Sequence, residues 1–353
     1  MKKLLLATLA MLAIACSSDN NDPENNPEPV EDCIYVGNIN LMSQADVDAF
    51  AAHHYCEIKG DLNIGSIDAV ATNITNIGGL ESLKSISGSL IIENNPQLIN
   101  LHGLNSLVQI NNNLFIHQNS ALTNLEGIGP VKKMMSLDIS LNISLQNLKG
   151  LENVESVSDF GVSDNDVLTS LEGVENLTLI DGSLGISGKS LTSLEALHSL
   201  SEVENIYIST TSLINLKGLE GVSGVKELYI RFNNSLTTLE GLQGINTFTS
   251  LTIVQNPTLA SISHLSGLTL HQPDEFTNNN IRIDFNFMLP SLDGLQNITG
   301  FTGDIYLQKN IILKDFCAIR DIVTYGGNTI SLYIAGNLYD PLKYQIIAGN
   351  CSQ

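Results

Sequence analysis

The chain has 353 residues, and its 37 acidic side chains outnumber 16 Lys and Arg, which gives a formal net charge of −21 at pH 7. Binding to a phosphate backbone needs clustered Lys and Arg, so this balance argues against nucleic acid as a partner. A negative charge of this size mainly keeps a secreted protein soluble. It would strengthen binding only of a ligand that carries cationic groups or is bridged through metal ions.

The N-terminus predicts export. Two lysines precede an apolar run from Leu4 to Ile14, and Ala15 is followed by Cys16. The run is shorter than the roughly 18 residues that cross a bilayer, so residues 1–15 are predicted to be a cleaved signal peptide. The segment up to Cys16 resembles the bacterial lipobox, which implies lipidation of that cysteine. The alternative, ordinary cleavage, would leave a spare thiol in an oxidising compartment, where free thiols are rare.

Residues 16–32 are predicted to be a flexible acidic tether, because the stretch after Cys16 has no apolar residue with which to offset the entropy of ordering. In Gram-negative lipoproteins, Asp directly after the lipidated cysteine retains the protein in the inner membrane. Here Ser17 stands at that place, and this resemblance implies sorting to the outer membrane. The acidic stretch behind the cysteine resembles the export tag of surface lipoproteins in Bacteroidetes-type bacteria. These resemblances imply an outer-membrane lipoprotein at the cell surface, whose membrane contact is the lipid anchor alone.

Four further cysteines lie as one pair near each end of residues 33–353. Four cysteines allow three pairings. The repeats between the pairs would hold the two ends far apart, whereas a disulfide needs Cα atoms within about 7 Å. We therefore expect the disulfides Cys33–Cys56 and Cys317–Cys351. The alternative of a metal site lacks any close Cys or His spacing, and no metal or other cofactor is expected.

A repeat of 22–24 residues fills most of the chain after Cys56. The skeleton L-x-[IV]-x-x-N-x-x-L-x-x-L-x-G-[LIV] begins at Leu90, Leu114 and Leu137. Such a period predicts one short strand per coil, and the alternation in L-x-[IV] buries every second side chain. The expected strands start at Leu62, Leu90, Leu114, Leu137, Phe160, Leu184, Ile206, Leu228, Leu251, Ile281, Ile305 and Leu332. We predict an all-β-dominated, right-handed parallel β-solenoid of about 11–12 coils over 33–353, with caps at 33–61 and 314–353.

An asparagine recurs five residues after most strand starts, where a turn leaves backbone groups that a side-chain amide can satisfy. The predicted buried ladder consists of Asn95, Asn119, Asn142, Asn165, Asn233, Asn256, Asn286, Asn310 and Asn337. The coils that start at Leu184 and Ile206 lack it, and their next leucine arrives one residue early.

Glycines mark a second bend, where a missing Cβ permits positive φ or a close approach of the backbone. They are Gly79, Gly103, Gly127, Gly150, Gly173, Gly218, Gly241 and Gly294. Ala196 and His264 stand at this place in two coils, where we expect a less tight bend.

These repeats carry a family resemblance. The motif G-S-L-x-I-x-x-N from Gly88 to Asn95, followed by L-x-x-L-x-G-L, resembles the receptor L domains, relatives of leucine-rich repeats that bacterial lipoproteins contain in long runs. The resemblance covers nearly all of 33–353 and implies ligand binding, as in the L domains of growth-factor receptors. An internalin-like leucine-rich repeat is the nearest alternative, although its 22-residue period suits only the two short coils.

Selective recognition on a solenoid has to come from outward side chains or irregular loops. Tyr and Arg side by side on a rigid face are the residue types enriched in binding hot spots. The candidate ligand-binding patch on the outward face of the sheet consists of Tyr207, Tyr229, Arg231, Arg282, Tyr306 and Tyr333. The alternative is that these aromatic side chains stabilise the sheet through cross-strand packing.

One step of the repeat is longer than the others, the 30 residues from Leu251 to Ile281. The surplus lies within residues 266–280, which contain His271, Asp274 and Glu275. Long insertions in repeat proteins often contribute to a binding surface, but they are also tolerated at low thermodynamic cost. Both interpretations stay open at this point.

The sequence contains no G-x-S-x-G, H-E-x-x-H, P-loop or EF-hand motif. We therefore expect no enzyme, but a monomeric surface-binding protein or adhesin that engages an extracellular protein or glycan through the sheet face. One alternative is a β-helix enzyme that degrades polysaccharides. For it the outward Asp138, Asp159, Arg282 and Asp284 are the candidates, in two groups several coils apart. The other alternative is a passive surface spacer without a specific ligand.

Overall fold

The computed structural model describes residues 33–353 except 67, 69 and 272–279. The chain divides into two units, Met1–Asp32 and Cys33–Gln353, and the described residues all belong to the second. The predicted signal peptide, the lipidated Cys16 and the tether lie outside the described residues. Within the described ranges, no helix combines the length and apolar character that a membrane crossing requires.

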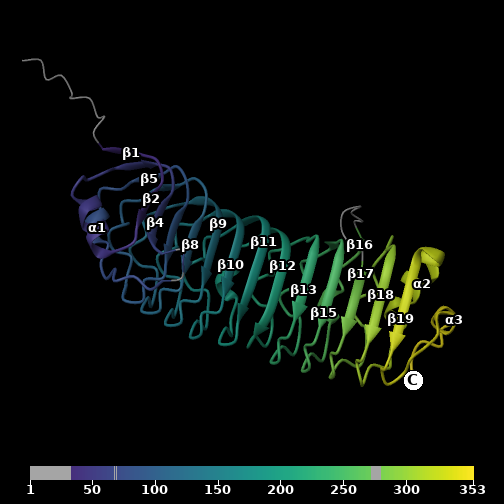
Figure 1. Ribbon diagram of the computed structural model, residues 1–353. Coiled ribbons are helices and arrows are strands. Elements are labelled where there is room, and N and C mark those ends of the chain that lie inside the picture. Colours follow the sequence, from purple (N-terminus) through teal and green to yellow (C-terminus); the bar gives the residue numbers. More distant parts are fainter. Residues whose placement is uncertain (1–32, 67, 69, 272–279) are drawn as a thin grey trace, which may run out of the picture. The chain divides into compact units, whose positions relative to one another are not determined.

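Residues 33–353 form the predicted parallel β-solenoid, with about 13 turns and coils of about 23 residues. One 13-stranded parallel sheet runs through it, and Figure 1 shows these strands side by side. Its strands in chain order are β2 (Ile39–Leu41), β4 (Leu62–Gly65), β6 (Leu90–Glu93), β8 (Leu114–His117), β9 (Lys133–Ser140), β10 (Ser156–Ser163), β11 (Leu179–Gly188), β12 (Glu202–Thr211), β13 (Glu227–Arg231), β15 (Ser250–Val254), β17 (Asn280–Asp284), β18 (Gly303–Gln308) and β19 (Ile330–Ala335).

All twelve predicted strand starts lie in this sheet. The thirteenth strand is β2, which pairs with β4 inside the predicted cap 33–61, so the first coil begins earlier than expected. Most strands bury alternate side chains: Leu90 and Ile92 are fully buried, whereas Ile91 between them is partly exposed. In β4 all four residues are buried. Stacked leucine and isoleucine side chains thus form one continuous core along the coils.

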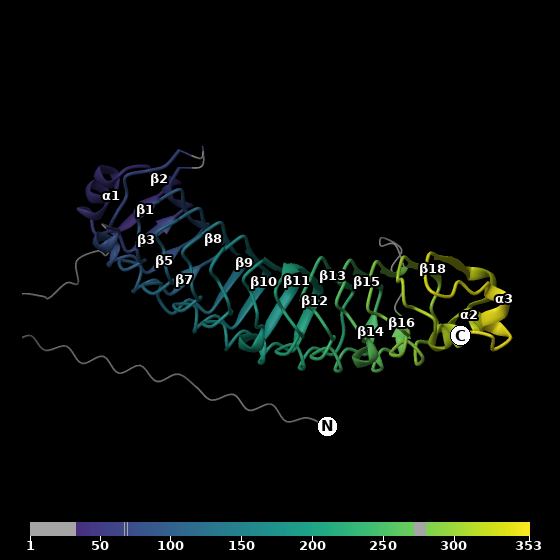
Figure 2. The same ribbon diagram turned by 90° about the horizontal axis from the view of Figure 1, so that it is seen from below.

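A second row of short parallel strands, which the repeat did not predict, lies just upstream of the main strands. Figure 2 shows its members β1, β3, β5 and β7 in the first coils and β14 and β16 further along. Their bounds are Ile34–Val36, Glu57–Lys59, Ser85–Ile86, Gln109–Ile110, Thr247–Phe248 and Leu270–His271. In the middle coils the two rows merge, which makes β9 to β12 eight to ten residues long.

Helices and disulfides close the two ends. At the first end, α1 (Gln44–Ala51) begins at Ser43, whose side chain accepts a hydrogen bond from the Asp46 backbone N–H, and it buries Val47 and Phe50. At the other end lie α2 (Arg320–Gly326) and α3 (Lys343–Ile347). The two predicted disulfides, Cys33–Cys56 and Cys317–Cys351, are confirmed, with Cα atoms 5.1 and 5.0 Å apart.

The predicted asparagines form two continuous hydrogen-bonded runs, Asn95 to Asn165 and Asn233 to Asn337, and all of them are buried except the half-buried Asn337. In each step the Oδ1 atom of one asparagine accepts hydrogen bonds from the backbone N–H and the Nδ2 of the asparagine before it; for Asn142 the two distances are 3.0 and 3.2 Å. The Nδ2 of Asn142 also donates to the Ile116 carbonyl at 2.8 Å. In the coil that starts at Ile206, Thr211 occupies the ladder position and donates to Asn233 Oδ1.

The second bend has two forms. Gly103, Gly127, Gly150, Gly173, Gly218, Gly241 and Gly294 all adopt left-handed backbone with φ between 109° and 123°. Ala196 and His264 lie instead in short 3-10 helices, Glu195–Leu197 and Ser263–Leu265. Gly79 also lies in such a helix, Gly78–Leu80, where a Cβ would approach Ala51 Cβ to 2.6 Å. Glycine is thus needed at this bend for φ in most coils and for close approach in one.

Candidate functional site

Five of the six predicted patch residues share one row across the sheet. The strand register aligns Tyr207 with Tyr229, Thr252, Arg282, Tyr306 and Tyr333, in that order, on β12, β13, β15, β17, β18 and β19. We call these six residues the outward row. The sixth patch residue, Arg231, lies two positions after Tyr229 on β13 and is paired with Val254 of β15.

The first end of the outward row is an aromatic and cationic cluster. The rings of Tyr207 and Tyr229 are 6.1 Å apart, and the Tyr207 hydroxyl donates to Glu227 Oε2 at 2.6 Å. Burial, reinforced by this hydrogen bond, raises the pKa of the Tyr207 phenol. The Arg231 guanidinium lies 5.0 Å from the Tyr229 ring centroid and 5.2 Å from that of Phe232, and its Nη1 donates to the Tyr229 hydroxyl at 2.9 Å. These contacts hold Arg231 against the sheet by cation–π attraction.

The second end is built on a buried carboxylate. The Asp284 side chain is fully enclosed, accepts from Arg282 Nε at 2.6 Å and from the Gln308 backbone N–H at 2.8 Å. The Arg282 guanidinium lies 5.5 Å from the Tyr306 centroid, and the Tyr306 and Tyr333 rings stack at 4.6 Å with 7° between their planes. The position and orientation of Arg282 are therefore fixed from below by Asp284 and from the side by Tyr306.

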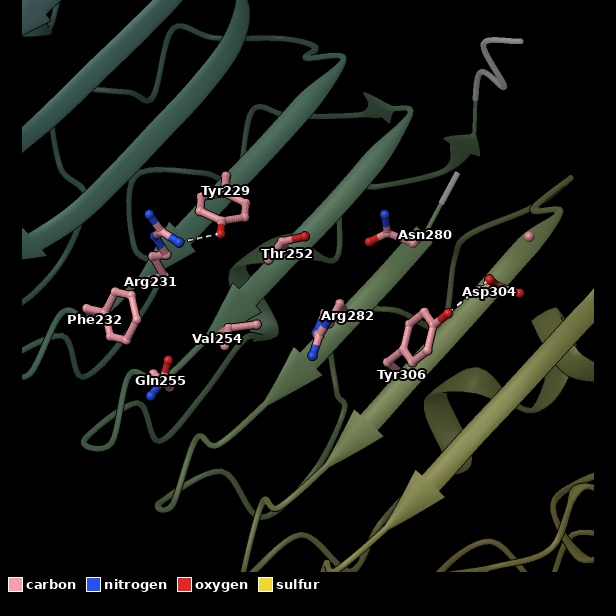
Figure 3. A pocket seen from close by; sticks show the side chains of 11 residues that line it. Tyr229, Arg231, Phe232, Thr252, Val254, Gln255, Asn280, Arg282, Asp304 and Tyr306 are labelled. Carbon is pink, nitrogen blue, oxygen red and sulfur yellow. Dashed lines mark hydrogen bonds between the residues drawn. The ribbon is translucent and has the colours of Figure 1, made fainter. Parts of the chain in front are cut away.

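A groove of about 780 Å³ separates the two ends (Figure 3), within the range typical of small-molecule sites. Thr252 and Val254 of β15 lie between the Tyr229–Arg231 side and the Arg282–Tyr306 side in this view. The hollow arises because Thr252 and Val254 are small, whereas the side chains paired with them on β13, Tyr229 and Arg231, are large. The lining residues are Tyr229, Arg231, Phe232, Thr252, Val254, Gln255, Asn280, Arg282, Gly303, Asp304 and Tyr306.

The groove thus brings together four of the predicted patch residues, whereas Tyr207 and Tyr333 flank it. It also includes residues that the sequence did not single out. Phe232 and Gln255 occupy the left-handed position just before the ladder asparagine, with φ of 57° each. Asp304 also lines the groove, where its Oδ2 accepts a hydrogen bond from the Tyr306 hydroxyl at 3.0 Å. This hydrogen bond raises the pKa of the Tyr306 phenol.

The predicted insertion 266–280 contributes at its end, because Asn280 on β17 lines the groove. His271 lies on β16, which pairs with β14. Asp274 and Glu275 lie outside the described residues. Hence the role of the insertion in binding stays a prediction.

A second polar cluster lies on the outward face of the first coils. His117 Nε2 and Asp138 Oδ1 are 2.9 Å apart, and the His117 ring stacks on Phe115 with centroids at 5.5 Å. Glu93 is paired with His117 in the register, and its Oε1 is enclosed without a hydrogen-bond partner among the described groups. Burial raises the pKa of Glu93, which the neighbouring His117 opposes.

Glu93→Gln is expected to raise the melting temperature at pH 7 and to leave it unchanged below about pH 4. A carboxyl group whose pKa is raised by folding adds stability only while it is protonated, and that stability is lost as pH rises through its folded-state pKa. Glutamine has nearly the same shape as glutamate but cannot ionise, so it removes the partly buried negative charge. Thermal melts of both proteins at pH 4 and 7 test this, with the exposed Glu81→Gln as control. Equal melting temperatures at pH 7 would contradict it.

The residues considered for polysaccharide cleavage stay in two separate groups, of which the first, Asp138 and Asp159, lies on the adjacent strands β9 and β10. Asp138 of β9 pairs with His117, and Asp159 of β10 accepts from the Ser183 backbone N–H at 3.0 Å. Four strands lie between Asp159 and β17 and five between Asp138 and β17, so Arg282 and Asp284 are at least about 24 Å away at 4.8 Å per strand spacing. Nor do the described residues include a group of three or more His, Cys, Asp or Glu arranged to hold a metal ion.

No protein-family model matches this chain, and no curated protein matches it either.

Proposed function

We propose that this protein is a non-enzymatic, receptor L-domain-like lipoprotein that binds an extracellular protein or glycan through the outward face of its sheet. The observation that carries the proposal is the groove, in which two Tyr and two Arg side chains face one hollow on a rigid sheet. These residue types dominate binding hot spots.

The preorganisation of the site favours binding over a purely structural role. Hydrogen bonds or ion pairs hold Arg231 on Tyr229 and Arg282 on Asp284 before any ligand arrives. Side chains that are already ordered lose little entropy on binding. Cross-strand packing explains the contact of Tyr306 with Tyr333, but it gives no reason for a hollow of about 780 Å³.

The proposed location is the outer membrane surface of a Bacteroidetes-type bacterium, with the lipid on Cys16 as the anchor. Its support is the signal peptide, the lipobox-like segment and the acidic stretch in the sequence. A solenoid on a tether would present the groove to ligands outside the cell, as an adhesin does. The separation of Asp138 and Asp159 from Arg282 and Asp284 supports the non-enzymatic part of the proposal, because a cleaving site has to gather its carboxylates and its cationic side chain around one scissile bond.

We expect the purified protein to bind one member of a panel of glycans and host-matrix proteins saturably. A Tyr207→Ala/Tyr229→Ala double variant is expected to bind at least about tenfold more weakly, because it removes Tyr229 from the groove lining and Tyr207 that packs beside it. Phe115→Ala, on an outward aromatic of β8, serves as the matched control and is expected to bind like wild type. Any bound glycan is checked for cleavage. Absence of saturable binding would favour a passive spacer, and cleavage would contradict the non-enzymatic proposal.

A further inference from the structure

Arg231 has a guanidinium that is held in place but not neutralised. None of the ion pairs among the described residues includes Arg231, whereas Arg282 in the same groove is paired with Asp284. Arginine has five N–H donors, and Arg231 uses one of them on the Tyr229 hydroxyl. The exposed guanidinium therefore retains a planar set of donors, the geometry that binds a carboxylate through two parallel hydrogen bonds.

The opposite side of the groove suits hydroxyl groups. Asp304 already accepts from the Tyr306 hydroxyl, and a carboxylate has room for further donors. Asn280, Gln255 and Thr252 add amide and hydroxyl groups along the lining. The positive charge of Arg282 is neutralised by the enclosed Asp284 carboxylate. Arg282 therefore offers the groove N–H donors without a net charge. A ligand that fits would carry its negative charge at the Arg231 end and hydroxyl groups along the rest.

The aromatic side chains add flat surfaces at both ends. Tyr229 on β13 and Tyr306 on β18 are three strand spacings apart, about 14 Å. This span suits a short oligosaccharide better than a protein segment, because the lining between the rings is mostly polar, whereas protein hot spots bury apolar anchors. The net charge of −21 would repel a long polyanion, which favours a ligand with few charges.

We propose that the groove binds a short acidic oligosaccharide, with a sugar carboxylate paired to the Arg231 guanidinium and the sugar rings lying between Tyr229 and Tyr306. This inference rests on the proposed binding function and specifies its ligand class. It assigns Arg231 the selectivity for the carboxylate and the remaining lining residues the contacts to hydroxyl groups.

The test is a titration of the full protein with uronate and sialyl oligosaccharides, each beside its methyl ester, which removes the charge and keeps the shape. We expect at least one acid to bind about tenfold or more tightly than its ester. Arg231→Gln is expected to abolish this difference, and Arg231→Lys to restore part of it, since lysine keeps the charge but loses the planar donors. Arg320→Gln, a change at the C-terminal end, is the matched control.

The outcomes separate the two proposals. Equal binding of acids and esters, a preference for sulfated glycans, or an unchanged preference in Arg231→Gln would overturn the assignment of an acidic sugar while leaving a binding protein. A protein partner from the matrix panel, with no glycan bound, would do the same. Failure of every glycan and protein to bind would overturn the binding function itself. Unchanged melting of the Arg231 variants shows that they are folded.

Discussion

Asn233→Leu is expected to lower the free energy of unfolding by about 3–5 kcal/mol. Asn233 is fully buried, and its Nδ2 donates to the Ile208 carbonyl at 3.2 Å. Its Oδ1 accepts from the backbone N–H and the hydroxyl of Thr211, at 3.1 and 2.7 Å. Leucine has a similar size but no polar atoms, so three buried groups would lose their partners. Denaturant titration of the purified protein measures the change.

The neighbouring Asn234 provides the matched control. Its side chain is exposed, and Asn234→Ala is expected to change the unfolding free energy by less than about 0.5 kcal/mol. Asn233→Thr is expected to lie between the two, because Thr72 and Thr211 already donate to ladder asparagines in the native chain. If Asn233→Leu unfolds at the same denaturant concentration as wild type, the ladder contributes nothing to stability.

Gly173→Ala is expected to destabilise the protein by about 3 kcal/mol or more. Gly173 has φ of 118°, which side chains rarely tolerate, and a Cβ there would overlap the backbone carbonyl of Leu148 in the preceding coil. Neither strain can be relieved by rotating a side chain, because the obstructing atoms belong to the backbone. The coil would have to move away from its neighbour and open the stacked core.

Gly185→Ala tests whether this loss comes from the bend rather than from glycine replacement as such. Gly185 lies on the outward face of β11, and the nearest atom to its added Cβ is the Phe160 carbonyl oxygen at 3.9 Å. We expect stability equal to wild type or slightly higher, since alanine reduces the freedom of the unfolded chain. Thermal and denaturant unfolding of both variants give the comparison, and similar losses in both would contradict the account of the bend.

The main sheet could be predicted because its signals repeat. Leu90 and Ile92 show the alternation of a strand with one buried face, and Asn95 marks the turn that follows. The second row of strands was not predictable in this way. Ser85–Ile86 has a single buried side chain, too short a stretch for any period, and it forms a strand only because the equivalent residues of adjacent coils pair with it.

The row of patch residues also followed from the repeat, since equal positions in successive coils meet across the sheet. Even the 30-residue step from Leu251 to Ile281 keeps this register, which pairs Thr252 with Arg282. The groove could not be predicted, because it depends on which side chains are too small to fill it, namely Thr252 and Val254. Asp284 was expected on the outward face of the sheet, but its enclosure beneath Arg282 became apparent only from the packing.

The most direct test of ligand binding in the groove is to fill the groove with a larger side chain of the protein itself. Thr252→Trp would place a large side chain in the hollow, whereas Ile91→Trp adds the same side chain at the equivalent outward position of β6. Titration with the ligand that wild type binds is expected to give equal dissociation constants for wild type and Ile91→Trp, and at least about tenfold weaker binding for Thr252→Trp. Equal binding by all three proteins would contradict a binding site in the groove.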